Sequence, residues 1–176
     1  MLNKIREFVK KEADEDDWKY HIVPVVNYSK KLAKILKQDE EIVELAALLH
    51  DIGRIKHGGK DHEITGIPEA EKLLKKHNCP QNVIDEVKHC IESHRGNKDA
   101  PPRTTIAKII ANADAMAHFD VLPVLLYWRC QKSSFEEAFK WLDDKIERDW
   151  NKKLTLPEAR KIMKEKYITG FPKIKI

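Results

Sequence analysis

The chain has 176 residues, which is enough for one domain of ordinary size with a buried core. Lysine and arginine number 33 against 29 acidic residues, and the formal net charge of +4 is too small to indicate a nucleic-acid-binding protein without a clustered patch. Basic residues do gather near the C-terminus, where we expect a solvated helix face: Lys152, Lys153, Arg160, Lys161, Lys164, Lys166, Lys173 and Lys175.

The cysteines and the apolar runs exclude further classes of protein. Cys79, Cys90 and Cys130 are odd in number and form no Cys-x-x-Cys pair, so neither a disulfide framework nor a zinc ribbon is predicted. We expect them to be buried thiols in a reducing cytosol. No apolar run reaches membrane-spanning length, and the N-terminal residues carry too much charge for a signal peptide, so we predict a cytoplasmic protein without a membrane partner.

Apolar residues recur at helical spacing along nearly the whole chain, and no segment alternates as strands do. We therefore predict an all-α fold. In chain order, helices are expected at residues 2–12, 21–36, 39–53, 65–77, 81–94 and 104–119, then in a segment restarting at Asp120 and Pro123, and finally at 134–150 and 156–167.

Glycine, proline and capping residues predict several of these boundaries. Gly53 is expected to be a left-handed stop that leaves 53–61 as a basic loop, and Gly96 to be a stop before a proline-bearing loop at 96–103. Further helix starts are expected at Thr65 or Gly66, with Pro68 in the first turn, and at Thr104. Two capping boxes are also expected. One pairs Ser133 or Ser134 with Glu136 or Glu137, and the other pairs Thr155 with Glu158.

The stretch from Leu45 to Arg54 is the most informative part of the chain. Residues 42–49 are apolar on nearly every helical face apart from Glu44, which is typical of a helix buried in a core. His50 and Asp51 follow at once. A buried imidazole or carboxylate is costly unless it is paired, hydrogen-bonded or bound to a metal, and a bound cation would satisfy both.

Two other predicted helices place a polar side chain on an apolar stripe. His21 lies four residues before Val25, and Asp114 lies among small alanines that would let a partner helix approach. A single buried histidine or aspartate is more often a hydrogen-bonded core residue. Together with His50 and Asp51, however, they predict a mixed imidazole and carboxylate site for a divalent ion such as Mn, Fe, Co, Ni or Mg, with Zn as a further candidate.

These residues resemble the HD-domain superfamily of metal-dependent phosphohydrolases. The resemblance rests on His21, on His50-Asp51 within Ala-Leu-Leu-His-Asp-Ile-Gly, and on Asp114 within Ala-Asp-Ala-Met. It implies a compact helical bundle of the HD-domain type in which the four side chains bind one divalent ion. We accordingly expect a single HD-type domain over residues 1–176, with a motif core at about 18–120 and C-terminal helices at about 121–170.

Some members of that superfamily carry two further histidines that build a second metal site. The resemblance would place them here at His62 and His94, so that two ions are the alternative to one. Either histidine could instead contact the substrate or position water. The Gly-Tyr-Pro sequence of the cyclic-di-nucleotide phosphodiesterase branch is absent, which argues against that branch.

The implied reaction is hydrolysis of a phosphomonoester or nucleotide by a metal-activated water. Asp51 is the residue predicted to orient the nucleophile. Cations that follow the ligand helices are candidates to hold the phosphate charge: Arg54, Lys56, Lys60 and Arg95. Arg54 stands where many relatives have lysine, and its planar guanidinium suits bidentate phosphate contact.

The remaining histidines and the aromatic residues are given lesser roles. His118 lies one turn after Asp114 and is expected to be either a hydrogen-bonding partner of the ligands or a pocket wall. His89 is expected to be exposed, and His57 to lie in a loop within reach of substrate. Five aromatic residues are expected to pack the C-terminal helices, where a homodimer contact is left open: Tyr127, Trp128, Phe135, Trp141 and Trp150.

Two other functions are left open by the same residues. One is a mixed-valent di-iron oxygenase, because some HD-domain proteins use the six-ligand arrangement that way. The other is a non-catalytic module that senses a nucleotide, although the presence of all four primary ligands argues against it. Iron content and oxygen consumption would separate the oxygenase from a hydrolase.

Overall fold

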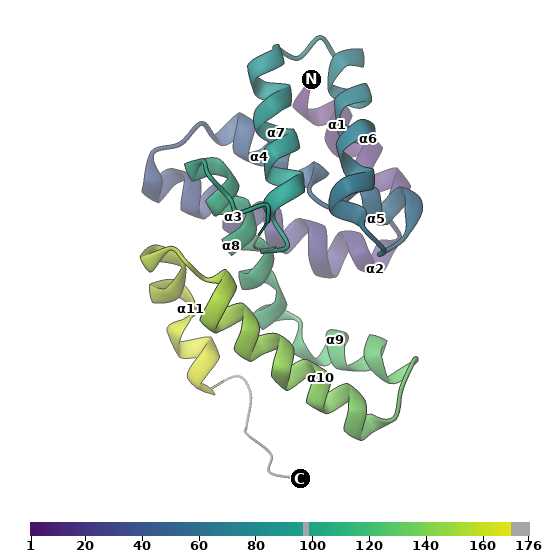
Figure 1. Cartoon of the computed structure of the whole chain (residues 1–176), viewed down its shortest axis with the longest axis vertical. Helices are drawn as coiled ribbons and strands as arrows, with labels where there is room; N and C mark the ends of the chain where they lie inside the picture. Colours follow the sequence, from purple (N-terminus) through teal and green to yellow (C-terminus); the bar gives the residue numbers. More distant parts are fainter. Residues whose placement is uncertain (97–98, 170–176) are drawn as a thin grey trace.

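The computed structural model describes residues 1–96 and 99–169, and every regular element within them is a helix (Figure 1), which confirms the predicted all-α fold. Two short segments are wide π-helical turns, labelled η. In chain order the elements are α1 (Leu2–Glu12), α2 (Glu15–Asp17), η1 (Trp18–Ile22), α3 (Val23–Leu36), α4 (Glu40–Leu49), α5 (Ile52–His57), α6 (His62–Lys76), α7 (Gln81–Ser93), α8 (Thr105–Asp120), α9 (Leu122–Cys130), α10 (Phe135–Arg148), η2 (Asp149–Lys153) and α11 (Pro157–Thr169).

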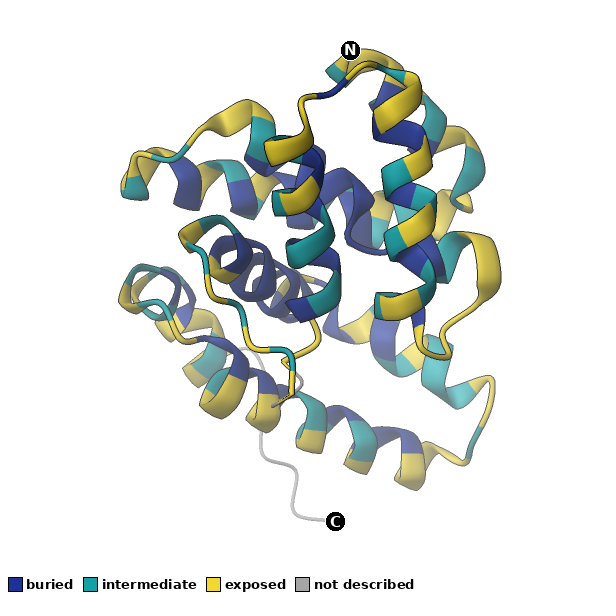
Figure 2. Ribbon diagram, turned by 45° about the horizontal axis from the view of Figure 1, so that its top comes forward, coloured by how far each residue is buried: buried dark blue, intermediate teal, exposed yellow. Residues whose placement is uncertain are grey.

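Helix α8 is the central element of the structure. It lies between a group that includes α1 and α4–α7 and a second group formed by α9–α11 (Figure 1), and it packs against α3, α7 and α11. Nearly every residue of α8 after its first turn is buried, while the outer helices are buried on their inward faces and exposed on the other side (Figure 2). The alanines of α8 have small side chains, which allow its neighbours to approach closely.

The break between α4 and α5 differs from the prediction. Helix α4 ends at Leu49 and α5 begins at Ile52, so Gly53 lies inside α5 and is not a left-handed stop. A Cβ at Gly53 would lie 2.1 Å from the carbonyl oxygen of His62 and 2.6 Å from the amide nitrogen of Gly66. Glycine is therefore required here because α5 touches the backbone of α6, and the predicted loop at 53–61 shrinks to residues 58–61.

Helix α6 begins earlier than predicted, at His62 instead of Thr65 or Gly66, and Pro68 lies inside it instead of in the first turn. This start brings the side chain of His62 onto a helix instead of leaving it in a loop. It follows Asp61, whose φ of 49° turns the chain from the loop into the helix.

Most of the predicted caps are confirmed, with one exception. Thr104 accepts a hydrogen bond from the amide of Ala107 at the start of α8, Ser134 and Glu137 form the capping box of α10, and Gly96 has the left-handed φ of 74° expected of a stop. The box at Thr155 is wrong: α11 begins at Pro157. The Thr155 hydroxyl instead accepts a hydrogen bond from the side-chain amide of Asn112 on α8.

The two π-helical turns lie in segments that the sequence predicted to be regular α-helix. The helix expected from residue 21 has η1 as its first turn, and the one expected at 134–150 becomes α10 followed by η2. Such wide turns occur frequently at functional sites because they redirect side chains. Here η1 carries His21, and η2 carries Asp149 and Lys153.

Three further expectations concern burial and the chain ends. Cys79 and Cys90 are buried as predicted, whereas Cys130 is only half-buried because it ends α9. Within the described residues no single helix is long and apolar enough to span a membrane. Helices α8 and α9 meet the length and hydropathy criterion only when they are taken together, and a 79° bend separates them. Lys173 and Lys175 lie outside the described residues, and the single-domain organisation stays a prediction.

Candidate metal centre

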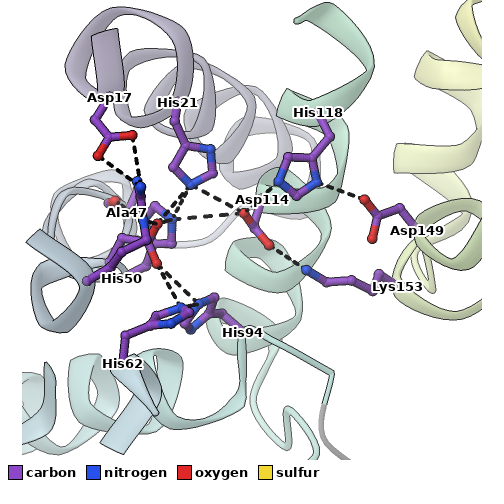
Figure 3. A network of polar contacts seen from close by, with 12 residues as sticks. Asp17, His21, Ala47, His50, His62, His94, Asp114, His118, Asp149 and Lys153 are labelled. Atoms are coloured by element: carbon purple, nitrogen blue, oxygen red, sulfur yellow. Dashed lines mark hydrogen bonds and ion pairs between the residues drawn. The ribbon is translucent and has the colours of Figure 1, made fainter. Parts of the chain in front are cut away.

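Four side chains from three separate segments meet at one point. His21 from η1, His50 and Asp51 from the α4–α5 break, and Asp114 from α8 are all buried, and we call them the quartet. Figure 3 labels three of them, His21, His50 and Asp114. Nε2 of His21 lies 3.1 Å from Nε2 of His50, 3.1 Å from Oδ2 of Asp51 and 3.5 Å from Oδ1 of Asp114. The structure therefore brings together all four residues predicted as metal ligands.

A second group shares Asp51 with the quartet. Its other oxygen, Oδ1, lies 3.1 Å from Nε2 of His62 and 3.5 Å from Nε2 of His94, and these two nitrogens are 3.2 Å apart. We call Asp51, His62 and His94 the Asp51 triad. The backbone of Asp51 has φ −107° and ψ 17°, the bridge region in which active-site residues are often found, and this conformation lets one carboxylate face both groups.

The tautomers of three histidines are set by the backbone. Nδ1 of His50, His62 and His94 lies 2.8, 3.0 and 2.7 Å from the carbonyl oxygens of Ala47, Gly59 and Ile91. A carbonyl can only accept, so each Nδ1 carries a proton and donates, and in its neutral form each ring turns the lone pair of Nε2 toward Asp51. Backbone carbonyls hold metal-ligating histidines in this way.

The electrostatic environment keeps His50, Asp51 and Asp114 in the forms that bind metals. Burial lowers the pKa of His50 to about 3, so its ring is neutral at neutral pH. Burial raises the pKa values of Asp51 and Asp114, but neighbouring cationic and imidazole groups outweigh it and hold both well below their ordinary range. For His62, burial lowers the pKa, but Asp51 outweighs it and raises the value.

These donors fit a divalent cation. Carboxylate oxygens and imidazole Nε2 atoms converge on each other, and when the rings are neutral with the proton on Nδ1 this arrangement is repulsive unless a positive ion lies between. Three members of the quartet, His21, His50 and Asp51, offer donor atoms within 4.8 Å of one another, and so do the three members of the Asp51 triad. A mixed nitrogen and oxygen set of this kind suits first-row divalent ions.

Sequence reasoning missed the groups that contact Asp114 from the far side. Nζ of Lys153 lies 2.5 Å from Oδ2 of Asp114, and both side chains are buried. Lys153 was expected on a solvated helix face, and that expectation is wrong because η2 turns it inward against α8. The sequence contains no signal for this, since a lysine in a basic segment is usually solvated.

His118 connects Asp114 to a second buried acid. Its Nδ1 donates a hydrogen bond to Oδ2 of Asp149 at 2.8 Å, and its Nε2 lies 3.6 Å from Oδ1 of Asp114 (Figure 3). Burial, aided by Lys145, lowers the pKa of His118 to about 4 although both acids oppose this. Burial raises the pKa of Asp149, but His118, Lys145 and Lys153 lower it to about 2.

Arg54 contacts two carboxylates. Its Nε donates to Oδ2 of Asp51 at 2.7 Å, while Nη1 lies 2.8 and 2.9 Å from the two oxygens of Asp17. Burial lowers the pKa of Arg54, but the carboxylates of Asp51 and Asp17 outweigh burial and raise the pKa above its ordinary value. The guanidinium is therefore charged at every working pH. Asp17 was not singled out from the sequence because it lies in an acidic turn that looks solvated.

The other predicted phosphate-binding cations are placed differently from one another. Arg95 reaches the same cavity as the quartet and donates to Glu63 at 2.7 Å. Lys56 pairs with Glu12, and Lys60 is exposed; neither lines the cavity. His57 is also outside the lining and pairs with Glu69.

The quartet, apart from the fully buried His50, and the Asp51 triad line a cavity of about 390 Å³. Its walls also come from the C-terminal helices, which contribute Leu125, Trp128, Trp141, Lys145, Arg148 and Lys153. Trp128 and Trp141 thus border the cavity. Trp150 stacks on Tyr167 as expected of a packing residue, whereas Tyr127 and Phe135 are exposed.

His89 was expected to be exposed, but its side chain is only 11% exposed because the backbone amide of Arg103 donates to its ring.

Comparison with known proteins agrees with this geometry. A family model described as HD domain matches residues 18–118. A tRNA (cytidine(56)-2'-O)-methyltransferase of Picrophilus torridus is 33% identical over 114 residues, a match that covers 57% of this chain and 31% of that enzyme. The chain therefore spans less than a third of the length of this relative.

Two solved structures share the fold. A predicted HD superfamily hydrolase from an uncultured Thermotogales bacterium superposes with a TM-score of 0.61 at 24% identity, covering 84% of this chain and 90% of that one. Bacillus subtilis YpgQ in complex with ADP superposes with a TM-score of 0.73 at 20% identity, covering 95% of this chain and 87% of that one.

Proposed function

Since the chain belongs to the HD domain family, we propose that it is a metal-dependent phosphohydrolase that acts on a phosphomonoester or a nucleotide. One observation carries the proposal: the quartet and the Asp51 triad share one carboxylate, and they lie in a cavity bordered by cationic side chains. The carboxylates and imidazoles would bind the metal ion, and the cationic side chains would bind the phosphate oxygens.

The quartet would hold the first divalent ion, and His62 with His94 would hold a second by sharing Asp51. When bound, such an ion lowers the pKa of a water ligand and polarises the phosphoryl oxygen. Asp51 has the role of orienting the attacking water, because its two oxygens face both groups of donors. Arg54 holds Asp51 in that orientation through its 2.7 Å hydrogen bond.

The substrate phosphate would be held by the cations that border the cavity. Arg95 was predicted for this role, and the structure adds Lys145 and Arg148 from α10 as candidates. The side chain of Arg148 is 55% exposed and lies 3.8 Å from Asp149, so it has donors free to bind an entering anion. Trp128, Trp141 and Leu125 provide an apolar wall for the organic part of the ester.

Metal analysis followed by a phosphatase screen tests the proposal. Purified protein is expected to contain a divalent metal and to release phosphate from nucleotides or sugar phosphates, and chelation should abolish this activity. The screen includes ADP, which was bound in the YpgQ structure. Asp51→Ala should remove activity while the protein stays folded. Asp144 is an exposed acid on α10, and Asp144→Ala should leave the activity unchanged. Turnover that survives Asp51→Ala would refute the proposal.

A di-iron oxygenase is the second candidate, and the shared carboxylate favours it. Asp51 faces two histidines on each side, so these side chains would hold two iron ions, which would supply the chemistry with oxygen. Protein that contains two iron atoms per chain, consumes oxygen and releases no phosphate would favour this function. Nucleotide binding without either reaction would favour a sensing module.

A further inference from the structure

His118 is a buried imidazole to which neither the HD-type pattern nor the mechanism above gives a role. It lies on α8 one turn after Asp114, is 7% exposed and lines the cavity. Its ring stacks on that of His21 with centroids 5.7 Å apart and an interplanar angle of 12°. The ring therefore lies beside the quartet without belonging to it.

The orientation of His118 matches that of the predicted ligands. Its Nδ1 is held by Oδ2 of Asp149, which accepts the proton, so in the neutral ring the lone pair is on Nε2. That lone pair faces Oδ1 of Asp114 across 3.6 Å, where no hydrogen is available to join them. A carboxylate that holds Nδ1–H of a histidine is the usual support for a metal-binding Nε2.

The donors around His118 belong to the same centre as the quartet. His21, Asp114 and His118 offer donor atoms within 4.8 Å of one another, as do His21, His50 and Asp51. Both groups use Nε2 of His21, which faces Asp51 at 3.1 Å and Asp114 at 3.5 Å. A ring nitrogen has one lone pair and binds one ion, so an ion held by Nε2 of His21 would be bordered by donors of both groups.

We propose that Nε2 of His118 is a fifth protein ligand of the ion bound by the quartet, with Asp149 as the residue that positions it. Asp149 is fully buried and is itself held by Lys145, whose Nζ lies 3.4 Å from its Oδ2. The inference rests on the metal site proposed above. It makes the first ion more tightly enclosed than the second, which has three protein ligands.

Binding of Co²⁺ to metal-free protein tests the proposal independently of any hydrolysis. His62→Asn with His94→Asn removes the second group, so that the absorption spectrum and chelator competition report on the first. In this background His118→Asn should weaken Co²⁺ binding by about 100-fold or more and change the absorption bands, because asparagine keeps a donor to Asp149 but has no atom at the Nε2 position. Asp149→Asn should weaken binding by about 10- to 100-fold.

The control is His57→Asn, which removes an exposed histidine outside the cavity and should leave affinity and spectrum unchanged. His118→Gln, which replaces the nitrogen by an amide oxygen, should restore part of the affinity. An unchanged affinity and spectrum in a folded His118→Asn protein would overturn the proposal. A protein that binds Co²⁺ as expected but hydrolyses no phosphate would refute the proposed function and leave this ligand in place.

A measurement on unaltered protein covers the case in which the His118 variants do not fold. Protein labelled with nitrogen-15 and loaded with cadmium-113 should show a metal–nitrogen coupling at Nε2 of His118 as well as at Nε2 of His21 and His50. Couplings at His21 and His50 without one at His118 would show that His118 only supports the centre from outside, and the proposal would be wrong.

Discussion

Among the residues that the structure describes, Arg54 is the charged partner of Asp51 besides the histidines. From the sequence, Arg54 was predicted to bind substrate phosphate. The structure places its Nε on Asp51 and its Nη1 on both oxygens of Asp17, so a large part of its hydrogen-bonding capacity is used within the protein. Binding of substrate and positioning of Asp51 make different kinetic predictions.

If Arg54 positions Asp51, Arg54→Lys should lower kcat by about 10- to 100-fold with a smaller change in KM, because an ammonium group cannot contact both carboxylates at once. Asp17→Asn should change kcat in the same direction, since it releases the other end of the guanidinium. Steady-state kinetics of both variants checks this, with Lys56→Ala as a control on the same helix. A rise in KM without a change in kcat would contradict this prediction and indicate that Arg54 binds the substrate phosphate.

At the scale of elements, contacts between helices decide which residues are possible at several sites. Gly53 and Gly66 let α5 and α6 touch through their backbones, and this contact fixes where His62 enters the Asp51 triad. Glu44 is a second example: it is the one charged residue in the apolar part of α4, and it is buried. It pairs with Arg6 from α1 and, at 2.6 Å, with Lys30 from α3.

Gly53→Ala should destabilise the protein by about 3 kcal/mol or more, because the new methyl group would overlap backbone atoms of α6 that have no room to move. Urea unfolding of the metal-free protein measures this change. Gly59→Ala is the matched control, since a Cβ there would meet no atom within 4 Å. Equal stability of the two variants would mean that the close approach of α5 and α6 is not present in solution.

Glu44→Gln should cost about 1.5–3 kcal/mol at pH 7, the range for hydrogen bonds between charged groups. Burial raises the pKa of Glu44, but Lys30 and Arg6 outweigh it and hold the pKa below its ordinary value. The stabilisation is therefore present above the unfolded pKa of about 4.3 and is lost as pH falls below it.

Urea unfolding of wild type and Glu44→Gln at pH 7 and pH 3 checks this sign. The difference in unfolding free energy should shrink at the lower pH, and Glu7→Gln, an exposed acid on α1, should show no such difference at either pH. A difference that stays constant with pH would contradict the ion-pair explanation and point to packing instead.

For the molecule as a whole, the C-terminal helices complete the cavity that the HD-type core begins. The family match ends at residue 118, yet Trp141, Lys145 and Arg148 of α10 line the same cavity as the quartet. Substrate preference is therefore expected to depend on α9 and α10 more than on the ligand helices. A cytoplasmic location and a homodimer stay predictions.

Arg148→Ala should raise KM for a phosphate ester by roughly 10-fold, the loss of about one charge-assisted hydrogen bond, and should weaken inhibition by inorganic phosphate to a similar degree. Metal content should not change. Lys140→Ala removes an exposed cation from the same helix and should have no effect. Normal KM and phosphate inhibition in Arg148→Ala would show that α10 does not bind the phosphate.

The sequence by itself determined the all-α fold, most helix caps and the four quartet residues. Helical periodicity, capping residues and a polar pair at the end of an apolar helix are local properties, and each can be recognised without knowing what lies nearby in space. The convergence of His21, His50-Asp51 and Asp114 was predicted because their apolar surroundings already required burial.

Only the tertiary structure decided the role of Gly53, the buried position of Lys153 and the bond between His118 and Asp149. Each depends on a residue far along the chain: α6 meets α5, and η2 turns back onto α8. A glycine that makes room for another helix has the same sequence appearance as one that ends a helix, and a lysine that pairs with a buried acid looks like a solvated one. Which of these applies is fixed by packing between distant segments, which local patterns do not contain.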